Sequence, residues 1–381
     1  MSHYDDLETR SADERRAAQD AALREVAGIG LDDLAAQPVL RKADLATRQK
    51  ENPPFGGLTV GNVAYVFQSP GPIYEPGSAA PDWWRMGRFL HAVGLGTTDT
   101  VQNCFGYHLT PAGHMFESGA RAVGAVVIPA GTGQTDLQVR AAADLGATAY
   151  AGTPDYLKVI LDRADAMGER LGIVKAAVGG GALFPSLRQE YADRGIHCRQ
   201  CYATADLGNV AYESESTGGM IVDEGVVVEI VRPGTGDPVP DGEAGEVVVT
   251  TLNPDYPLVR FATGDLSAVL PGRSPCGRTN MRIKGWMGRA DQTAKIKGMF
   301  VRPEQVADLV SRHPEIRRAR VVVDRDGAMD AMTVRVEADG GDEGAWAKSV
   351  EDVLKLRGAV ERVDDLPGDG IVIEDRRDYD G

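Results

Sequence analysis

The sequence is short of cysteine, of long apolar runs and of positive charge, and the first two shortages exclude whole classes of protein. Its four cysteines, Cys104, Cys198, Cys201 and Cys276, are scattered through 381 residues without a disulfide framework, so we expect free thiols. No window approaches the roughly 18 consecutive apolar residues of a membrane helix. The opening MSHYDDLETRS lacks the pattern of a signal peptide. We therefore expect a cytoplasmic protein with no membrane partner.

The shortage of positive charge bears on the ligand. The 41 Lys and Arg residues are outnumbered by 56 Asp and Glu residues, which gives a formal net charge of −15. Nucleic-acid backbones are held by clustered basic residues, so we expect no nucleic-acid partner. A local basic pocket for a small phosphorylated ligand is still compatible with this balance.

The chain changes character along its length. Residues 7–27 are polar and predict an amphipathic helix. From Val126 to Gly195, apolar strands alternate with helical segments, a pattern typical of a parallel sheet covered on both faces. From about Met220, alternating apolar and polar residues on both sides of a Gly/Pro/Asp turn predict antiparallel hairpins.

These patterns predict an α/β fold. A large N-terminal domain, residues 1–287, has parallel sheets and helices plus a β-hairpin subdomain, and a small α+β domain, residues 288–381, follows a hinge at the GRADQ boundary. Ligands in such folds bind beyond the carboxyl ends of the strands. The candidate binding rim is therefore Gly131–Thr135, Thr153–Asp155 and Gly179–Gly181.

One stretch raises a separate question. The run AYVF, Ala64–Phe67, predicts a strand, and QSPGPIYEPG, Gln68–Gly77, predicts a stiff loop after it. Three interpretations are open at this point: a phosphate cradle, a wall of the substrate pocket or a simple turn.

The order of several motifs resembles the phenylacetate–CoA ligase family of adenylate-forming enzymes from about Ala64 to Gln305. These are VIPAGTGQT, GTPDYL, GGGALFPSLR, QCYATADLG, GEAGEVVVTTL, PLVRFATGDL and MGRADQTAKIKG. The resemblance implies that a small, preferably aromatic, carboxylic acid is activated with ATP to an acyl-AMP, after which a C-terminal lid swings and coenzyme A displaces AMP. It implies ATP or AMP, Mg²⁺ and coenzyme A as cofactors, and leaves a homodimer open.

The resemblance also assigns residues to the nucleoside. Asp265 matches the acid that binds the ribose hydroxyls, with a turn aspartate as the alternative. Arg289 matches the arginine that supports the ribose, with a surface ion pair as the alternative, and Asp291 matches the hinge residue. Tyr202 matches the ring that stacks on adenine, with a core tyrosine as the alternative. The bare backbone under adenine is matched by Gly179, Gly180, Gly181 and Ala182.

At the phosphates the chain departs from the family. The hydroxyl residue of the α-phosphate is Thr204, one place early, and the magnesium acid is the shorter Asp206. The family's Ser/Thr/Gly loop with its lysine is replaced by QSPGPIYEPG, whose prolines have no N–H to donate. We expect Glu75 to repel phosphate, and Ser69 and Gly71 are the remaining candidates for phosphate contacts.

The lid and the acyl pocket give further expectations. Ile371 occupies the apparent place of the lid lysine, whose loss would cost about 3–4 kcal/mol in the transition state. Lys297 is a candidate in the thioester-forming pose. The candidates for the acyl pocket, in FGYHLTPAGHMF, are Tyr107, His108 and His114. His108 is also a candidate general base, with a packed loop histidine as the alternative.

A structural zinc of some relatives is not expected here. Four soft ligands are normally needed, and Cys276 is accompanied only by Ser214, Ile221 and Ser274.

Two functions are compatible with the sequence. The first is an ATP-dependent acyl–CoA ligase, which we favour. The alternative is an AMP-binding or regulatory relative that has lost efficient adenylation.

Overall fold

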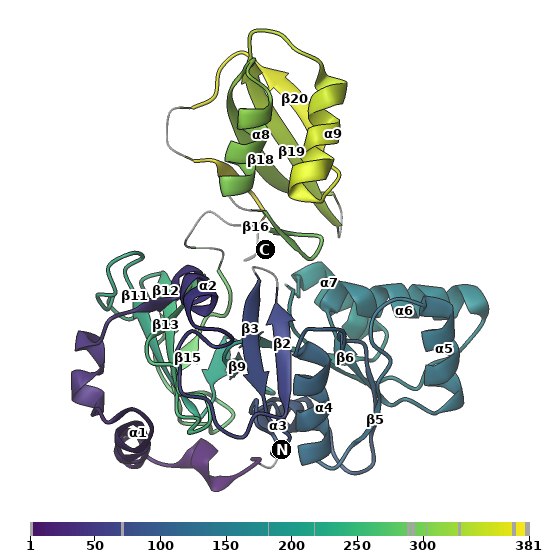
Figure 1. The fold of residues 1–381 in the computed structure, drawn as a ribbon. Coiled ribbons are helices and arrows are strands. Elements are labelled where there is room, and N and C mark those ends of the chain that lie inside the picture. The colour runs from purple at the N-terminus through teal and green to yellow at the C-terminus, as the bar shows by residue number, and fades with distance from the viewer. Residues whose placement is uncertain are drawn as a thin grey trace. The chain divides into compact units, whose positions relative to one another are not determined.

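The computed structural model describes residues 3–69, 72–181, 183–216, 218–287, 290, 294–301, 303–326, 329–367 and 371–377. The chain divides into two compact units, Met1–Met287 and Gly288–Gly381 (Figure 1). No helix in the described part of the chain is long and apolar enough to span a lipid bilayer.

The larger sheet of the first unit has the strand order β14-β15-β10-β9-β8-β7-β6-β4-β5. Its parallel part confirms the predicted alternation of strands and helices, and consists of β4 (Thr100–Asn103), β5 (Val126–Ile128), β6 (Ala149–Gly152), β7 (Lys175–Val178) and β8 (His197–Thr204). The antiparallel part is β9 (Gly208–Tyr212), β10 (Met220–Val222), β14 (Val269–Leu270) and β15 (Arg282–Ile283).

The helices of this part pack on the parallel strands. They are α3 (Gly87–Val93), α4 (Ala112–Ala122), α5 (Thr135–Asp144), α6 (Pro154–Met167) and α7 (Pro185–Asp193). Figure 1 shows α5 and α6 together on the side of β5 and β6. Both α6 and α7 begin at a proline, whose missing N–H has no partner to lose in the first turn of a helix.

A second sheet of this unit has the order β1-β13-β12-β11. The antiparallel pairing of β11 (Val226–Val231) with β12 (Gly245–Thr251), and of β12 with β13 (Phe261–Ser267), confirms the predicted hairpin region. The short β1 (Leu40–Arg41) pairs in parallel with β13, and α2 (Lys42–Glu51) begins directly after it. The chain therefore leaves this sheet at Lys42.

The stretch predicted to be a loop is mostly strand. β2 (Tyr65–Ser69) and β3 (Ile73–Gly77) form an antiparallel hairpin in which Pro76 stands opposite Val66. A two-stranded sheet has only edge strands, where a residue without an N–H is tolerated, so the prolines did not exclude a strand as we had expected. The loop prediction was wrong on this point.

The N-terminal segment is broken into η1 (Asp6–Thr9), α1 (Ala12–Ala27) and η2 (Leu31–Ala36) rather than forming one helix from residue 7. α1 begins at Ala12 because Ser11 and Glu14 form a reciprocal capping box. Glu8 is buried and accepts from Arg278 Nε at 2.6 Å and from the Tyr212 hydroxyl at 2.6 Å. The segment is thereby tied to the core of the first unit.

The second unit is a small α+β structure with sheet order β20-β19-β18-β21. Its elements are β16 (Ala294–Ile296), β17 (Met299–Val301), α8 (Pro303–Arg312), β18 (Ile316–Asp326), β19 (Met329–Ala338), α9 (Glu343–Leu354), β20 (Ala359–Val363) and β21 (Ile373–Asp375). Trp346 of α9 is fully buried in its core. The predicted fold class is confirmed in both units.

Candidate active site

Asp265 lies where the two sheets of the first unit meet. It is 9% exposed within β13, so it is not the turn aspartate that we considered as an alternative. The Tyr202 hydroxyl of β8 donates to its Oδ2 at 2.8 Å, and Trp286 Nε1 donates to its Oδ1 at 2.9 Å. A carboxylate has about four lone-pair sites and accepts hydrogen bonds from hydroxyl groups, which is the chemistry that a ribose requires.

Trp286 was missed by the sequence analysis, although it stands just before the GRADQ boundary. Tyr202 is 8% exposed, and its hydroxyl is committed to Asp265. Its ring remains a predicted stacking partner for adenine. Arg289, Asp291 and Ala182 lie outside the described residues.

Asp206 follows β8 and is paired with a residue that we did not anticipate. Lys42 Nζ, on the first residue of α2, lies 2.6 Å from Asp206 Oδ2. The aspartate is 4% exposed, and among the described residues its other oxygen, Oδ1, has no hydrogen-bond partner. Thr204 lies at the end of the same strand, where its Oγ1 accepts from the Leu207 N–H at 3.1 Å. A buried carboxylate oxygen without a donor is suited to a cation.

Glu75 of β3 is fully buried beside this pair and holds Ser69. It accepts from the Ser69 N–H at 3.2 Å and from the Ser69 hydroxyl. Burial, followed by the charge of Asp206, raises the pKa of Glu75 to about 8, while Lys42 acts in the opposite direction. The carboxyl is therefore mainly neutral at pH 7, which weakens the repulsion of phosphate that we expected from it.

This contact also changes the expectation for Ser69. Both of its donors are directed to Glu75, so Ser69 would have to exchange that partner before it could bind phosphate. The other predicted phosphate contact, Gly71, lies outside the described residues.

The glycine turn follows β7, the neighbour of β8 in the sheet. Gly180 has a φ of +69°, a left-handed conformation that glycine adopts at no steric cost. A Cβ on Gly179 would come within 3.0 Å of Cys201 Sγ, whereas one on Gly181 would meet only Pro154, at 3.5 Å. The turn thus presents backbone at the carboxyl edge of the sheet, as predicted for this rim.

Two of the three acyl-pocket candidates lie together. The ring centroid of His114, on α4, is 5.2 Å from that of Tyr107 and 4.9 Å from that of Tyr65. The ring centroid of Phe67 also lies 5.2 Å from that of His114. The sequence analysis treated Tyr65 and Phe67 only as strand residues, and their alternation in AYVF was the available signal. His108 is exposed between β4 and α4, and no observation tests its role as a base.

Burial affects the chemistry of this aromatic cluster. The Tyr107 hydroxyl accepts from Asn103 Nδ2 at 2.8 Å. Burial, aided by Glu117, raises the pKa of Tyr107, so it stays a neutral hydroxyl at physiological pH. The cluster offers aromatic ring faces together with the hydroxyls of Tyr65 and Tyr107, which suits a small aromatic group.

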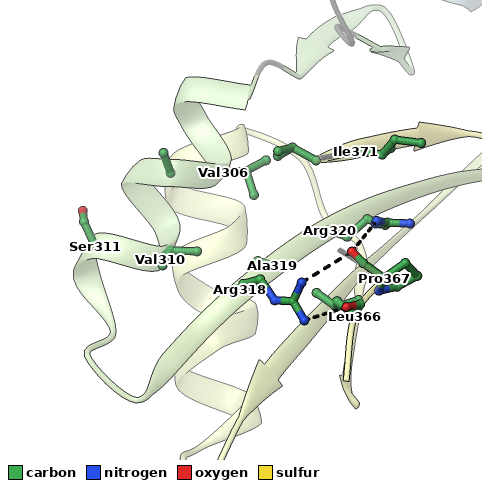
Figure 2. Close-up of a pocket in the computed structure, with 11 residues that line it drawn as sticks. Val306, Val310, Ser311, Arg318, Ala319, Arg320, Leu366, Pro367 and Ile371 are labelled. Atoms are coloured by element: carbon green, nitrogen blue, oxygen red, sulfur yellow. Dashed lines mark hydrogen bonds between the residues drawn. The ribbon is translucent and has the colours of Figure 1, made fainter. Parts of the chain in front are cut away.

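Lys297 and Ile371 belong to the second unit. The Lys297 N–H donates to Asp330 Oδ2 at 2.8 Å. Ile371 is 40% exposed and lines a cavity of about 530 Å³, together with Val306 and Val310 of α8 (Figure 2). The cavity's polar edge is formed by Arg318, which donates to the Leu366 carbonyl at 2.6 Å.

The positions compared with zinc ligands do gather in space. Cys276 Sγ is 3.0 Å from Ser274 Oγ and 3.4 Å from Ser214 Oγ. Hydroxyls are not the soft ligands of a structural zinc. In the described residues, no group of three or more His, Cys, Asp or Glu side chains is arranged to hold a metal ion.

Comparisons with known proteins match most of the chain. Residues 91–253 match the family model of the AMP-binding enzymes. A phenylacetate–coenzyme A ligase of Aromatoleum evansii is 31% identical over 329 residues, covering 81% of this chain and 72% of the relative. One from Thermus thermophilus is 29% identical over 342 residues, covering 85% of this chain and 76% of the relative.

A solved structure has the same fold. It is described as a 2-hydroxyisobutyryl-CoA ligase in complex with 2-HIB-AMP and CoA in the thioesterification state. The TM-score is 0.83 at 22% identity, and the match covers 98% of this chain and 92% of that one.

Proposed function

Because this chain belongs to the phenylacetate–coenzyme A ligase family, we infer that it is an ATP-dependent ligase that converts a small carboxylic acid to an acyl-AMP and then to a coenzyme A thioester. The observation that carries this inference in the structure is Asp265, buried and held by Tyr202 and Trp286 at the meeting point of the two sheets.

Asp265 accepts hydrogen bonds from the ribose hydroxyls in this proposal. The donors Tyr202 and Trp286 fix the carboxylate in place, so little reorganisation is needed when the nucleotide binds. The glycine turn at Gly179–Gly181 and the ring of Tyr202 receive adenine. Arg289, whose structure is not described, keeps its predicted role in supporting the ribose.

The phosphates lie at Thr204 and Asp206, at the end of the same strand. Oδ1 of Asp206, buried and without a donor, fits Mg²⁺, which takes one or two carboxylates and completes its shell with phosphate oxygens and water. The metal would neutralise charge on the triphosphate. Asp206 positions it, and Thr204 contacts the α-phosphate.

The side group of the acid packs against the rings of Tyr65, Phe67, Tyr107 and His114. The ring centroids of Tyr65, Phe67 and Tyr107 each lie about 5 Å from that of His114, and this group of aromatic rings supports an aromatic acid over a charged or sugar-like one. Lys297 acts in the thioester-forming half-reaction. Assembly as a homodimer and a cytoplasmic location stay predictions.

The alternative of an impaired AMP-binding relative rested on the proline-containing hairpin and on Ile371. The relatives named above are ligases, and Glu75 is mainly neutral rather than a fixed negative charge, so the ligase is favoured. The missing loop lysine still requires an explanation.

The test is acid-dependent pyrophosphate release from MgATP with arylacetic, benzoic and short aliphatic acids. Asp265→Asn should lower the rate by about 10- to 100-fold, since hydrogen bonds to a charged group contribute about 1.5–3 kcal/mol each. Asp241→Asn, which removes an exposed carboxylate from a turn, is the matched control and should leave the rate unchanged. If no acid supports release by the unmodified protein, the impaired relative becomes the better description.

A further inference from the structure

The missing loop lysine draws attention to the ammonium beside Asp206. Neither the family motifs nor the sequence analysis assigned Lys42 a role. We propose that Lys42 is a catalytic residue that contacts the β- and γ-phosphates of ATP during adenylation and thereby replaces the lysine that the β2–β3 hairpin lacks. This inference rests on the proposed function.

The position of Lys42 is fixed by its neighbours in the fold. Arg41 of β1 pairs with Ala262 of β13, the strand that carries Asp265, and Lys42 is the next residue. At the far end of α2, Gln49 makes two reciprocal hydrogen bonds to the backbone of Tyr74 in β3, at 2.7 and 2.8 Å. The helix is therefore attached both to the sheet of the proposed ribose acid and to the hairpin (Figure 1).

The charges around Lys42 favour a cation that can change partners. The side chain of Asp206 is 1% exposed and that of Lys42 is 33% exposed, so the aspartate is enclosed while the lysine reaches solvent. An ammonium has three donors on a flexible stem, and it can bind phosphate oxygens without a fixed geometry. Divalent metal at Asp206 Oδ1 would weaken the hold of Asp206 on Lys42 and direct the ammonium toward the phosphates.

This contact has a defined place in the reaction. During adenylation an oxygen of the substrate carboxylate bonds to the α-phosphorus, the bond to the bridging oxygen breaks, and pyrophosphate leaves with the electron pair. Negative charge grows on the leaving group, and a cation already in place stabilises it. No pyrophosphate is present when coenzyme A attacks the acyl-AMP, so Lys42 should be dispensable in that second half-reaction.

The difference between the half-reactions provides the test. Lys42→Gln keeps a hydrogen-bond donor for Asp206 but removes the charge, and Lys50→Met on the same helix is the control. Acyl-AMP formation from MgATP should fall at least about 10-fold in Lys42→Gln. In the same variant, thioester formation from chemically prepared acyl-AMP should stay within about twofold of the rate of the unmodified protein. Lys42→Arg keeps the positive charge and should retain part of the acyl-AMP formation. An equal loss in both half-reactions indicates a structural ion pair and overturns the proposal, as does no loss in either.

Binding measurements separate this proposal from the proposed function. Lys42→Gln should weaken ATP binding at least about fivefold while AMP binding is unchanged, whether or not an active acid has been found. If the variant does not fold, ATP, and not AMP, should protect Lys42 of the unmodified protein from an amine-reactive reagent, as read by mass spectrometry. Equal effects on ATP and AMP contradict the role of Lys42 even if the protein is a ligase.

Discussion

The nucleoside side and the phosphate side of this site hold their carboxylates in different ways. Asp265 accepts hydrogen bonds from two neutral donors, the Tyr202 hydroxyl and the Trp286 indole. Asp206 is held by the cation of Lys42, beside the buried carboxyl of Glu75. Neutral donors orient a carboxylate without cancelling its charge, whereas in the proposed function the ion pair at Asp206 exchanges partners when the triphosphate and its metal bind.

The comparison predicts that Asp206 acts in the first half-reaction alone, whereas Asp265 acts in both. Asp206→Asn should lower acyl-AMP formation by about 10²- to 10³-fold, since it removes the charge that we propose positions magnesium on the triphosphate. Thioester formation from supplied acyl-AMP should change little. Asp265→Asn should lower both half-reactions, because the ribose is present in both. Rapid-quench measurement of each step checks this contrast, and equal losses for Asp206→Asn would remove the distinction between the two sides.

The family motifs singled out Asp265, Tyr202 and Asp206, because each stands in a short stretch with recognisable neighbours. They could not reveal Lys42, which is separated from Asp206 by 164 residues and meets it only when β1 joins the sheet of β13. Trp286 was missed because its contact with Asp265, 21 residues earlier in the chain, forms only in the folded protein. The hairpin was mistaken for a loop because proline was weighed as a strand breaker before it was known that both strands are edges.

The donors to Asp265 should have a smaller effect than Asp265 itself. Trp286→Phe and Tyr202→Phe each remove one hydrogen bond and keep an aromatic ring at the position. We expect each to lower both half-reactions by roughly 10-fold, since one bond to a charged group is lost. The Km for ATP should rise in each variant. A loss confined to acyl-AMP formation would contradict the assignment of this side to the nucleoside.

Glu75 predicts a pH dependence of stability on the phosphate side. Its pKa in the folded protein is raised from 4.5 to about 8, so the folded state binds more protons than the unfolded state between these values. The stabilisation is complete below pH 4.5 and is lost as the pH rises through 8, at no more than about 1.4 kcal/mol per pH unit. The variant Glu75→Gln should not lose this stabilisation with rising pH, because glutamine does not ionise.

Urea unfolding of the unmodified protein and of Glu75→Gln at pH 5, 7 and 9 checks the sign. The free energy of unfolding of the unmodified protein, relative to that of the variant, should decrease from pH 5 to pH 9. A difference that increases with pH would mean that Glu75 is held in its charged form, with Lys42 as its dominant neighbour.

The smallest effect is expected at Ile371, where the lid lysine of the family is absent. Ile371 is 40% exposed at the rim of the cavity in the second unit, so a lysine can lay its aliphatic stem along the same apolar surface and keep its ammonium in water. We therefore expect Ile371→Lys to leave the melting temperature within about 2 °C and to raise acyl-AMP formation several-fold. Because Lys42 is proposed to replace the loop lysine and not the lid lysine, the gain should be equal in the Lys42→Gln background and in the unmodified protein. A larger gain in the Lys42→Gln background would mean that the two cations serve the same charge of the reaction.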